Sequence, residues 1–260
     1  MLAQRNPVAV VALLLVLSGC AGHAPGAPWG PRLPEAGQIG GAASRAARSP
    51  ATWVPLAAAA ALAVAGDADE ELSEWAGDHT PLFGRDAEAV SDDLRTAALV
   101  AYGVTALAAP AERFRDRVGG VLVGAVALTA EDLVTDTVKT VSDRERPDGS
   151  DHESFTSGHA GTSSAASTLA RRNLGHLTLP GWIETSARVG LHGLAGATGW
   201  ARVEAERHHV TDVLAGYAVG HFVADFFHHA FMAPAVPPLQ VSVSPVGRGG
   251  VVTVAVALQR

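Results

Sequence analysis

The sequence has one cysteine, few aromatic residues and no excess of positive charge. Aromatic residues make up 5% of the 260 residues, and 19 basic against 26 acidic side chains give a formal net charge of −7. Without a basic stripe the chain lacks the electrostatic footprint of a nucleic-acid-binding protein, so no nucleic-acid partner is expected. Most of the acidic excess is local, because residues 67–93 hold ten acidic side chains and one basic one. Such a run is typical of a solvated helical face.

Long apolar runs are also missing outside the N-terminus. A spanning helix needs about 20 mostly apolar residues, whereas the longest uncharged stretch, 49–66, has 18, and 97–111 and 118–130 are shorter. Runs of this length suit helices in a protein core, which favours a globular domain. The alternative is an integral inner-membrane bundle of five or six short spans, because alanine and glycine allow close helix packing in either setting.

The N-terminus has the pattern of a bacterial export signal. Arg5 precedes an apolar run over residues 8–17, and small residues follow before Cys20. The residues Leu17–Cys20 resemble the lipobox of bacterial lipoproteins. That resemblance implies a signal peptide over 1–19 and an acylated Cys20, with the protein lipid-anchored in the cell envelope and facing the periplasm. An ordinary signal peptide or an N-terminal membrane anchor is the alternative.

The residue after the cysteine bears on the choice of membrane. Ala21 gives no sign of an inner-membrane retention signal, which favours the outer membrane.

Alanine, glycine and proline supply 19 of the 30 residues in 21–50. A segment of that composition buries too little apolar surface to offset its ordering entropy. Residues 20–50 are therefore predicted to form a flexible tether.

Helical signals dominate residues 51–235, and they predict an all-α bundle of about six core helices. Proline and glycine separate the segments. Beyond 235 the pattern changes to alternating β-branched residues around a glycine-rich turn, which predicts a β-hairpin within 236–260. The expected helices cover 53–65, 69–75, 88–108, 111–141, 158–174, 181–199 and 207–231.

Three short clusters in the helical region carry the groups that a phosphate needs. In chain order they are Lys139 with Arg146 and Pro147, then Ser157, Gly158 and His159, and then Arg202, His208 and Asp212. Arginine forks suit bidentate binding of phosphate, and a helix that starts at Gly158 presents free N–H groups to an anion. His228 and His229 lack the further ligands of a metal site, so no metal is expected.

The histidines supply the reactive groups. His208 and Asp212 are four residues apart, so on one helix they share a face. The carboxylate would hold one ring nitrogen and leave the other free to attack phosphorus. His209 is three residues before Asp212 and could also pair with it. The spacing of the motif from Arg202 favours His208 as the partner. His159 would protonate the leaving alcohol and later activate water.

These clusters resemble the three signature motifs of the type 2 phosphatidic acid phosphatase superfamily, which includes class A acid phosphatases and vanadium haloperoxidases. The resemblance covers about residues 55–235. No cofactor is expected. Thr156 and Ala201 stand where the family usually has proline and serine. The roles it implies are His208 as nucleophile, Asp212 as its partner, His159 as general acid and base, and Lys139, Arg146, Ser157, Gly158 and Arg202 as phosphate ligands.

The expected activity is metal-independent hydrolysis of a phosphate monoester or pyrophosphate through a phosphohistidine. The substrate would be a membrane lipid phosphate or a small phosphoester, and vanadate would inhibit. Two alternatives remain open. One is a vanadium-dependent haloperoxidase, in which vanadate is the cofactor. The other is a phosphate-binding lipoprotein with weakened catalysis, which the departures at Thr156 and Ala201 suggest.

Overall fold

The computed structural model describes residues 29–232, 240–246 and 249–255. The expected signal peptide and Cys20 lie outside these residues. The described part contains eight α-helices and one short 3-10 helix, η1 (Gly84–Asp86). The α-helices are α2 (Ala36–Arg48), α3 (Pro50–Ala63), α4 (Ala68–His79), α5 (Ala87–Ala108), α6 (Phe114–Ser142), α7 (Gly158–Leu174), α8 (Gly181–Glu204) and α9 (Val210–Phe231). The predicted all-α fold is confirmed, and α2 is the one α-helix of the described part that lies outside the expected ranges.

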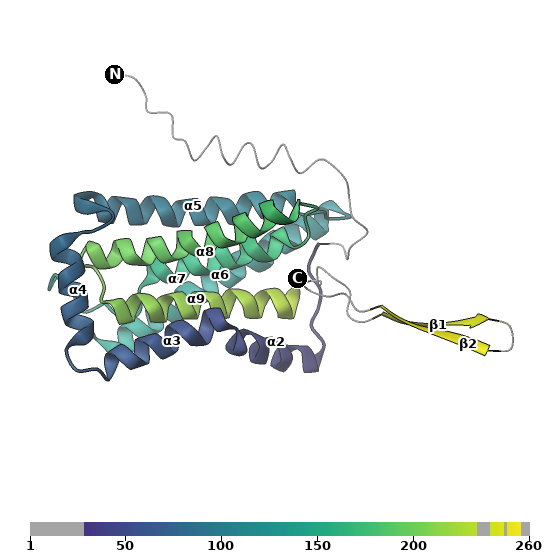
Figure 1. Ribbon diagram of the computed structural model, residues 1–260, viewed down its shortest axis with the longest axis horizontal. Coiled ribbons are helices and arrows are strands. Elements are labelled where there is room, and N and C mark those ends of the chain that lie inside the picture. The colour runs from purple at the N-terminus through teal and green to yellow at the C-terminus, as the bar shows by residue number, and fades with distance from the viewer. Residues whose placement is uncertain (1–28, 233–239, 247–248, 256–260) are drawn as a thin grey trace, which may run out of the picture.

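The long helices lie side by side, and α4 crosses one end of the bundle (Figure 1). The axis of α4 is bent by 101° from that of α3. Helix α7 occupies the centre and packs against α5, α6, α8 and α9. Its sequence explains this position, because small residues such as Gly161, Ser164 and Ala165 let neighbouring helices approach closely, and most of its side chains are buried.

The contact between α7 and α9 is backbone against backbone. A Cβ atom added at Gly216 would collide with the carbonyl oxygen of Ser157, and one added at Gly220 would collide with that of Gly161. Only glycine permits this approach. As a result, the start of α7 is held directly against the first turns of α9.

The flexible tether predicted for residues 20–50 is wrong from residue 29 onward. Trp29 is 1% exposed, and its Nε1 donates a hydrogen bond of 3.0 Å to Oδ1 of Asn173. Arg32 bonds through its backbone N–H to the carbonyl oxygen of Phe231. Helix α2 follows and packs against α9. Composition did not reveal this order, because one buried tryptophan can fix a segment that is otherwise poor in apolar side chains.

The bundle has small or polar side chains inside and large apolar ones on its flanks. Buried polar residues include Ser163, Thr198 and Asp225, whereas Phe114, Leu122 and Trp182 are more than half exposed. Among the described residues α6 is long and apolar enough to cross a membrane, and α3 with α4 meets the same criterion only as a bent pair. Lipid-facing helices have this distribution.

Two strands follow the helices, β1 (Gln240–Val246) and β2 (Gly249–Ala255). They pair antiparallel, with Gln240 opposite Ala255 and Val246 opposite Gly249.

Candidate active site

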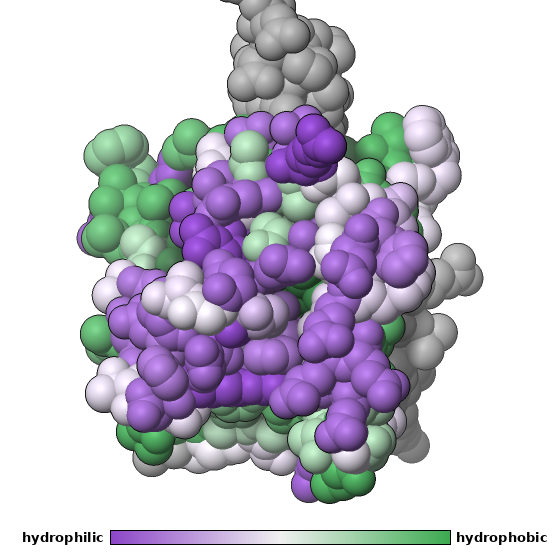
Figure 2. Space-filling model, turned by 90° about the vertical axis from the view of Figure 1, so that its left-hand side faces the viewer, coloured by the Kyte–Doolittle hydropathy of each residue, from purple (hydrophilic) through white to green (hydrophobic). Residues whose placement is uncertain are grey.

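The residues of the three motifs meet at the end of the bundle that α4 crosses. Figure 2 looks onto this end and shows hydrophilic side chains gathered across it, with hydrophobic ones towards the edges. The contributing segments are the last turns of α6 and α8, the turn between α8 and α9, the first turns of α7 and α9, and the loop over 143–157. They provide Lys139, Arg146, Ser157, Gly158, His159, Arg202, His208 and Asp212.

Backbone hydrogen bonds hold these segments together. The N–H of Ser157 donates to the carbonyl oxygen of Asp212 at 3.0 Å, which joins the second motif to the third. The N–H of Asp148 donates to the carbonyl oxygen of Glu206 at 3.2 Å, so the loop that carries Arg146 is fastened to the α8–α9 turn. The gathering of the motifs is therefore fixed by main-chain contacts.

His208 is held by a backbone carbonyl. Its ring is 2% exposed, and Nδ1 lies 2.7 Å from the carbonyl oxygen of Ser154. A carbonyl can only accept, so Nδ1 carries the proton and Nε2 keeps its lone pair. This tautomer is the one a nitrogen nucleophile requires, because Nε2 is then free to attack.

The predicted side-chain pair of His208 and Asp212 is wrong. Helix α9 begins at Val210 with His209 as its N-cap, so His208 precedes the helix and the i,i+4 relationship does not apply. Asp212 instead accepts hydrogen bonds from Ser154 Oγ at 2.5 Å and from the N–H of His209 at 2.8 Å. The Nδ1 atom of His209 also lies 3.3 Å from this carboxylate.

Arg144 and Asp69 complete the surroundings of Asp212. Nη1 of Arg144 lies 2.6 Å from Oδ1 of Asp212, and Nη2 lies 2.9 Å from Oδ2 of Asp69 on α4. Asp69 also accepts from the backbone N–H and the hydroxyl of Thr211. Burial works to raise the pKa of Asp212, but hydrogen bonds from His209 and Ser154 and the Arg144 charge outweigh it, so that pKa is lowered. The carboxylate therefore stays ionised.

Sequence reasoning missed both residues. Arg144 stands two positions before Arg146. A second arginine so close to a predicted phosphate ligand is the sequence feature that could have pointed to it. For Asp69 there was none, because its contact with Thr211 spans 142 residues of sequence.

Two buried donors at the centre of the site have no acceptor among the described residues. Ser157 Oγ and Arg202 Nε are buried and make no hydrogen bond to any described residue. Nζ of Lys139, the only lysine of the chain, lies 3.8 Å from the position of a Cβ at Gly158. Buried donors are nearly always paired in folded proteins. The arrangement is therefore that of a site for an oxyanion.

Both histidines of the site are neutral at pH 7. Burial, reinforced by the charge of Arg202, lowers the pKa of His208 to about 3, although Asp212 opposes the shift. Burial also lowers the pKa of His159 to about 4, and its hydrogen bond to Asp92 opposes this. Burial lowers the pKa of Arg202 to about 10, which leaves the guanidinium charged. The site thus combines fixed cations with neutral imidazoles.

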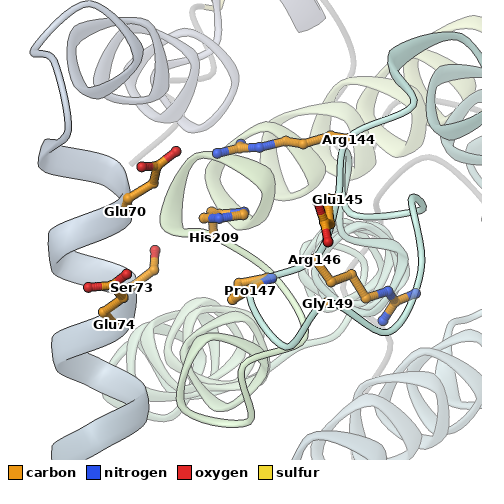
Figure 3. Close-up of a pocket in the computed structure, with 9 residues that line it drawn as sticks. All are labelled: Glu70, Ser73, Glu74, Arg144, Glu145, Arg146, Pro147, Gly149 and His209. Carbon is orange, nitrogen blue, oxygen red and sulfur yellow. The ribbon is translucent and has the colours of Figure 1, made fainter.

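Beside this centre lies a hollow of about 370 Å³ between α4 and the loop over 143–157. Figure 3 shows Glu70 and Glu74 on α4 facing Arg144 and His209 across it. Arg146 lines the hollow and is also a predicted phosphate ligand. The hollow is therefore adjacent to the predicted phosphate site. No group of three or more histidine, cysteine or acidic side chains within the described residues could hold a metal ion.

Comparison with known proteins agrees with this site. The family model of the PAP2 superfamily matches residues 134–234, a range that contains all eight predicted site residues. The structure is similar to the crystal structure of the first transmembrane PAP2 type phosphatidylglycerolphosphate phosphatase from Bacillus subtilis, with a TM-score of 0.51 and 21% sequence identity. The match covers 67% of this chain and 90% of that one. No curated protein matches the sequence. The match to the family model thus covers the segment that carries the three motifs, and the solved structure shares the fold of the chain.

Proposed function

We propose that the protein hydrolyses phosphate monoesters or pyrophosphates without a metal, through a phosphohistidine on His208. The observation that carries this proposal is the buried set of unpaired donors, Ser157 Oγ and Arg202 Nε, beside two neutral histidines. Lys139, Arg146, Ser157, Gly158 and Arg202 bind the phosphate oxygens. Their charges and N–H groups stabilise the negative charge on the equatorial oxygens in the transition state.

The reaction follows in two displacements. The negative charge of the bound phosphate offsets the cations that keep His159 neutral, so the ring takes up a proton when substrate binds. Nε2 of His208 attacks phosphorus while the bond from phosphorus to the leaving oxygen breaks, and the protonated His159 gives that oxygen a proton. His159, now neutral, takes a proton from a water molecule whose oxygen attacks phosphorus. The P–N bond then breaks and releases inorganic phosphate. Asp212 does not touch the ring of His208, and it acts by fixing Ser154, whose carbonyl sets the tautomer.

A lipid phosphate is the substrate class that the molecule fits best. The site lies at a polar end of a bundle whose flanks expose large apolar side chains, among them Phe114, Leu122 and Val126 on α6. A lipid that lies along such a flank would present its headgroup at this end. The similar structure from Bacillus subtilis is described as acting on phosphatidylglycerolphosphate.

Membrane attachment has two proposed components. Cys20 carries a lipid in the cell envelope, and α6 together with the apolar flanks contacts the bilayer, so that the site faces the periplasm. Replacement of Cys20 by serine separates the two components. We expect the variant still to require detergent for extraction from membranes. If the Cys20→Ser variant were instead found in the aqueous fraction, the lipid on Cys20 alone would attach the protein to the membrane.

The activity is tested by phosphate release from phosphatidic acid, phosphatidylglycerolphosphate and an aryl phosphate, each with a chelator present. We expect His208→Ala to lower the rate at least 1,000-fold, the order of loss for a covalent nucleophile. His152→Ala is the matched control, because His152 is an exposed histidine of the nearby loop. Equal rates in the two variants would defeat the mechanism. Vanadate should inhibit, and vanadate-dependent oxidation of bromide would identify a haloperoxidase instead.

A further inference from the structure

Helix α5 brings a fourth group of residues to the site, although it lies outside the three motifs and outside residues 134–234. Glu88, Ser91 and Asp92 are spaced i, i+3 and i+4, so they share one face of the helix. Ser91 Oγ accepts a hydrogen bond of 3.3 Å from Nη1 of Arg202, and Glu88 lies 4.0 Å from the same atom. Asp92 lies against His159.

The contact of Asp92 with His159 defines the state of the ring. Nε2 of His159 lies 2.7 Å from Oδ1 of Asp92. An ionised carboxylate only accepts, so Nε2 carries a proton. The hydrogen bond from His159, together with the Arg95 charge, keeps the pKa of Asp92 low, although burial opposes this. Nδ1 makes no hydrogen bond to any described residue, and it is the nitrogen left for a substrate.

We propose that Asp92 is a positioning residue that holds Nε2–H of His159 and thereby directs Nδ1 to the leaving-group oxygen. The inference rests on the proposed phosphatase reaction. During the reaction the proton on Nε2 stays on its nitrogen throughout. The proton on Nδ1 moves to the leaving oxygen as the P–O bond breaks, and Nδ1 later takes a proton from the attacking water.

The charges around His159 explain why a carboxylate is needed there. Arg95 on α5 and Arg202 on α8 both disfavour the imidazolium form, and Lys139 on α6 lies near the adjacent Gly158. Asp92 is the carboxylate that offsets them. Without it, the protonated ring that must serve as the general acid would form only at lower pH.

A different role for Asp92 predicts the opposite result. If Nε2 were the reacting nitrogen, the Asp92 carboxylate would occupy the place of the leaving group and would have to move before substrate binds. Removal of Asp92 would then raise activity and lower KM. The direction of change in kcat and KM therefore separates positioning from obstruction.

The test compares Asp92→Ala, Asp92→Asn and the control Asp93→Ala on the full-length protein with phosphatidic acid as substrate. Asp93 is the exposed neighbour of Asp92 on the same helix. We expect Asp92→Ala to lower kcat by roughly 10- to 100-fold, below the full value of general acid–base catalysis, with KM changed less than about twofold. The alkaline limb of its pH profile should move to lower pH. Asp92→Asn, which keeps an acceptor but loses the charge, should show the same pH shift with a smaller loss of kcat.

An Asp92→Ala variant that behaves like Asp93→Ala, or that is faster than wild type, would overturn the inference while leaving the phosphatase intact. Wild-type protein inactive on every phosphate would overturn the proposed function instead. A measurement independent of turnover tests the contact itself, through the 15N shifts of the His159 ring in micelles. We expect a protonated Nε2 in wild type and in Asp93→Ala. In Asp92→Ala, the ring of His159 should no longer prefer the tautomer with the proton on Nε2. An unchanged spectrum in that variant would also contradict the inference.

Discussion

The carbonyl oxygen of Ser154 accepts a hydrogen bond of 2.7 Å from Nδ1 of His208, and the hydroxyl of Ser154 donates one of 2.5 Å to Asp212. One residue therefore joins the proposed nucleophile to the acid four positions after it. A side-chain substitution at Ser154 removes the hydroxyl but leaves the carbonyl in place. The contact with Asp212 can therefore be removed without removing the acceptor that sets the tautomer of His208.

Ser154→Ala tests this separation. The backbone carbonyl remains, so we expect kcat to fall less than about 10-fold. The Asp212 carboxylate loses one of its donors, so the free energy of unfolding should fall by roughly 1–3 kcal/mol. Denaturation in micelles and phosphate release measure the two effects. A loss of activity as large as that of His208→Ala would show that the hydroxyl, and not the carbonyl, sets the state of His208.

Arg144→Leu should destabilise the site end of the protein. The change leaves the Asp69 and Asp212 carboxylates without their shared cation, and breaking a buried pair in this way costs about 3 kcal/mol. A double-mutant cycle with Asp69→Asn should show that the two losses are not additive. Arg85→Leu serves as the control, because Arg85 is exposed and makes no ion pair with any described residue. Additive losses would mean that the contact contributes nothing to stability.

Gly216→Ala should damage the phosphate site through packing alone. Its new Cβ would collide with the backbone of Ser157, and overpacking of this kind costs roughly 1–3 kcal/mol. We expect lower stability and lower activity, since Ser157 must move. Gly196→Ala is the matched control, because open space surrounds that position and alanine is favoured over glycine in a helix by roughly 0.5–1 kcal/mol. Gly216→Ala with normal stability and rate would contradict the close contact of α7 and α9.

Stability should fall as the pH is lowered from about 6.5. Burial lowers the pKa of His221 to about 4, so between these two values the unfolded chain binds a proton that the folded protein does not. Protons therefore favour unfolding in that window, and stability rises with pH across it. His221→Gln should flatten this slope by up to one proton. Unfolding measured at a series of pH values checks the slope, and an identical slope in the variant would contradict the account.

The sequence predicted the helices better than it predicted the contacts between distant side chains. Proline and glycine mark the ends of α7 and α8, and the spacing of Lys139, Arg146 and Arg202 is a local property of the chain. The structure brings these residues to one end of the bundle. Their roles in catalysis stay a prediction.

What the sequence did not reveal depends on contacts between distant residues. Asp92 meets His159 across 67 residues, and Trp29 meets Asn173 across 144. The pairing expected for Asp212 was wrong because α9 begins two residues after His208, and a helix start is hard to place from sequence to that accuracy.

The most direct measurement is an experimental structure of the protein with orthovanadate, which adopts the pentacoordinate geometry of phosphoryl transfer. The account predicts vanadium bonded to Nε2 of His208, with its oxygens bound by Ser157 Oγ and Arg202 Nε and its apical oxygen facing Nδ1 of His159. Vanadate bound elsewhere, or held with His208 turned away from the metal, would contradict it.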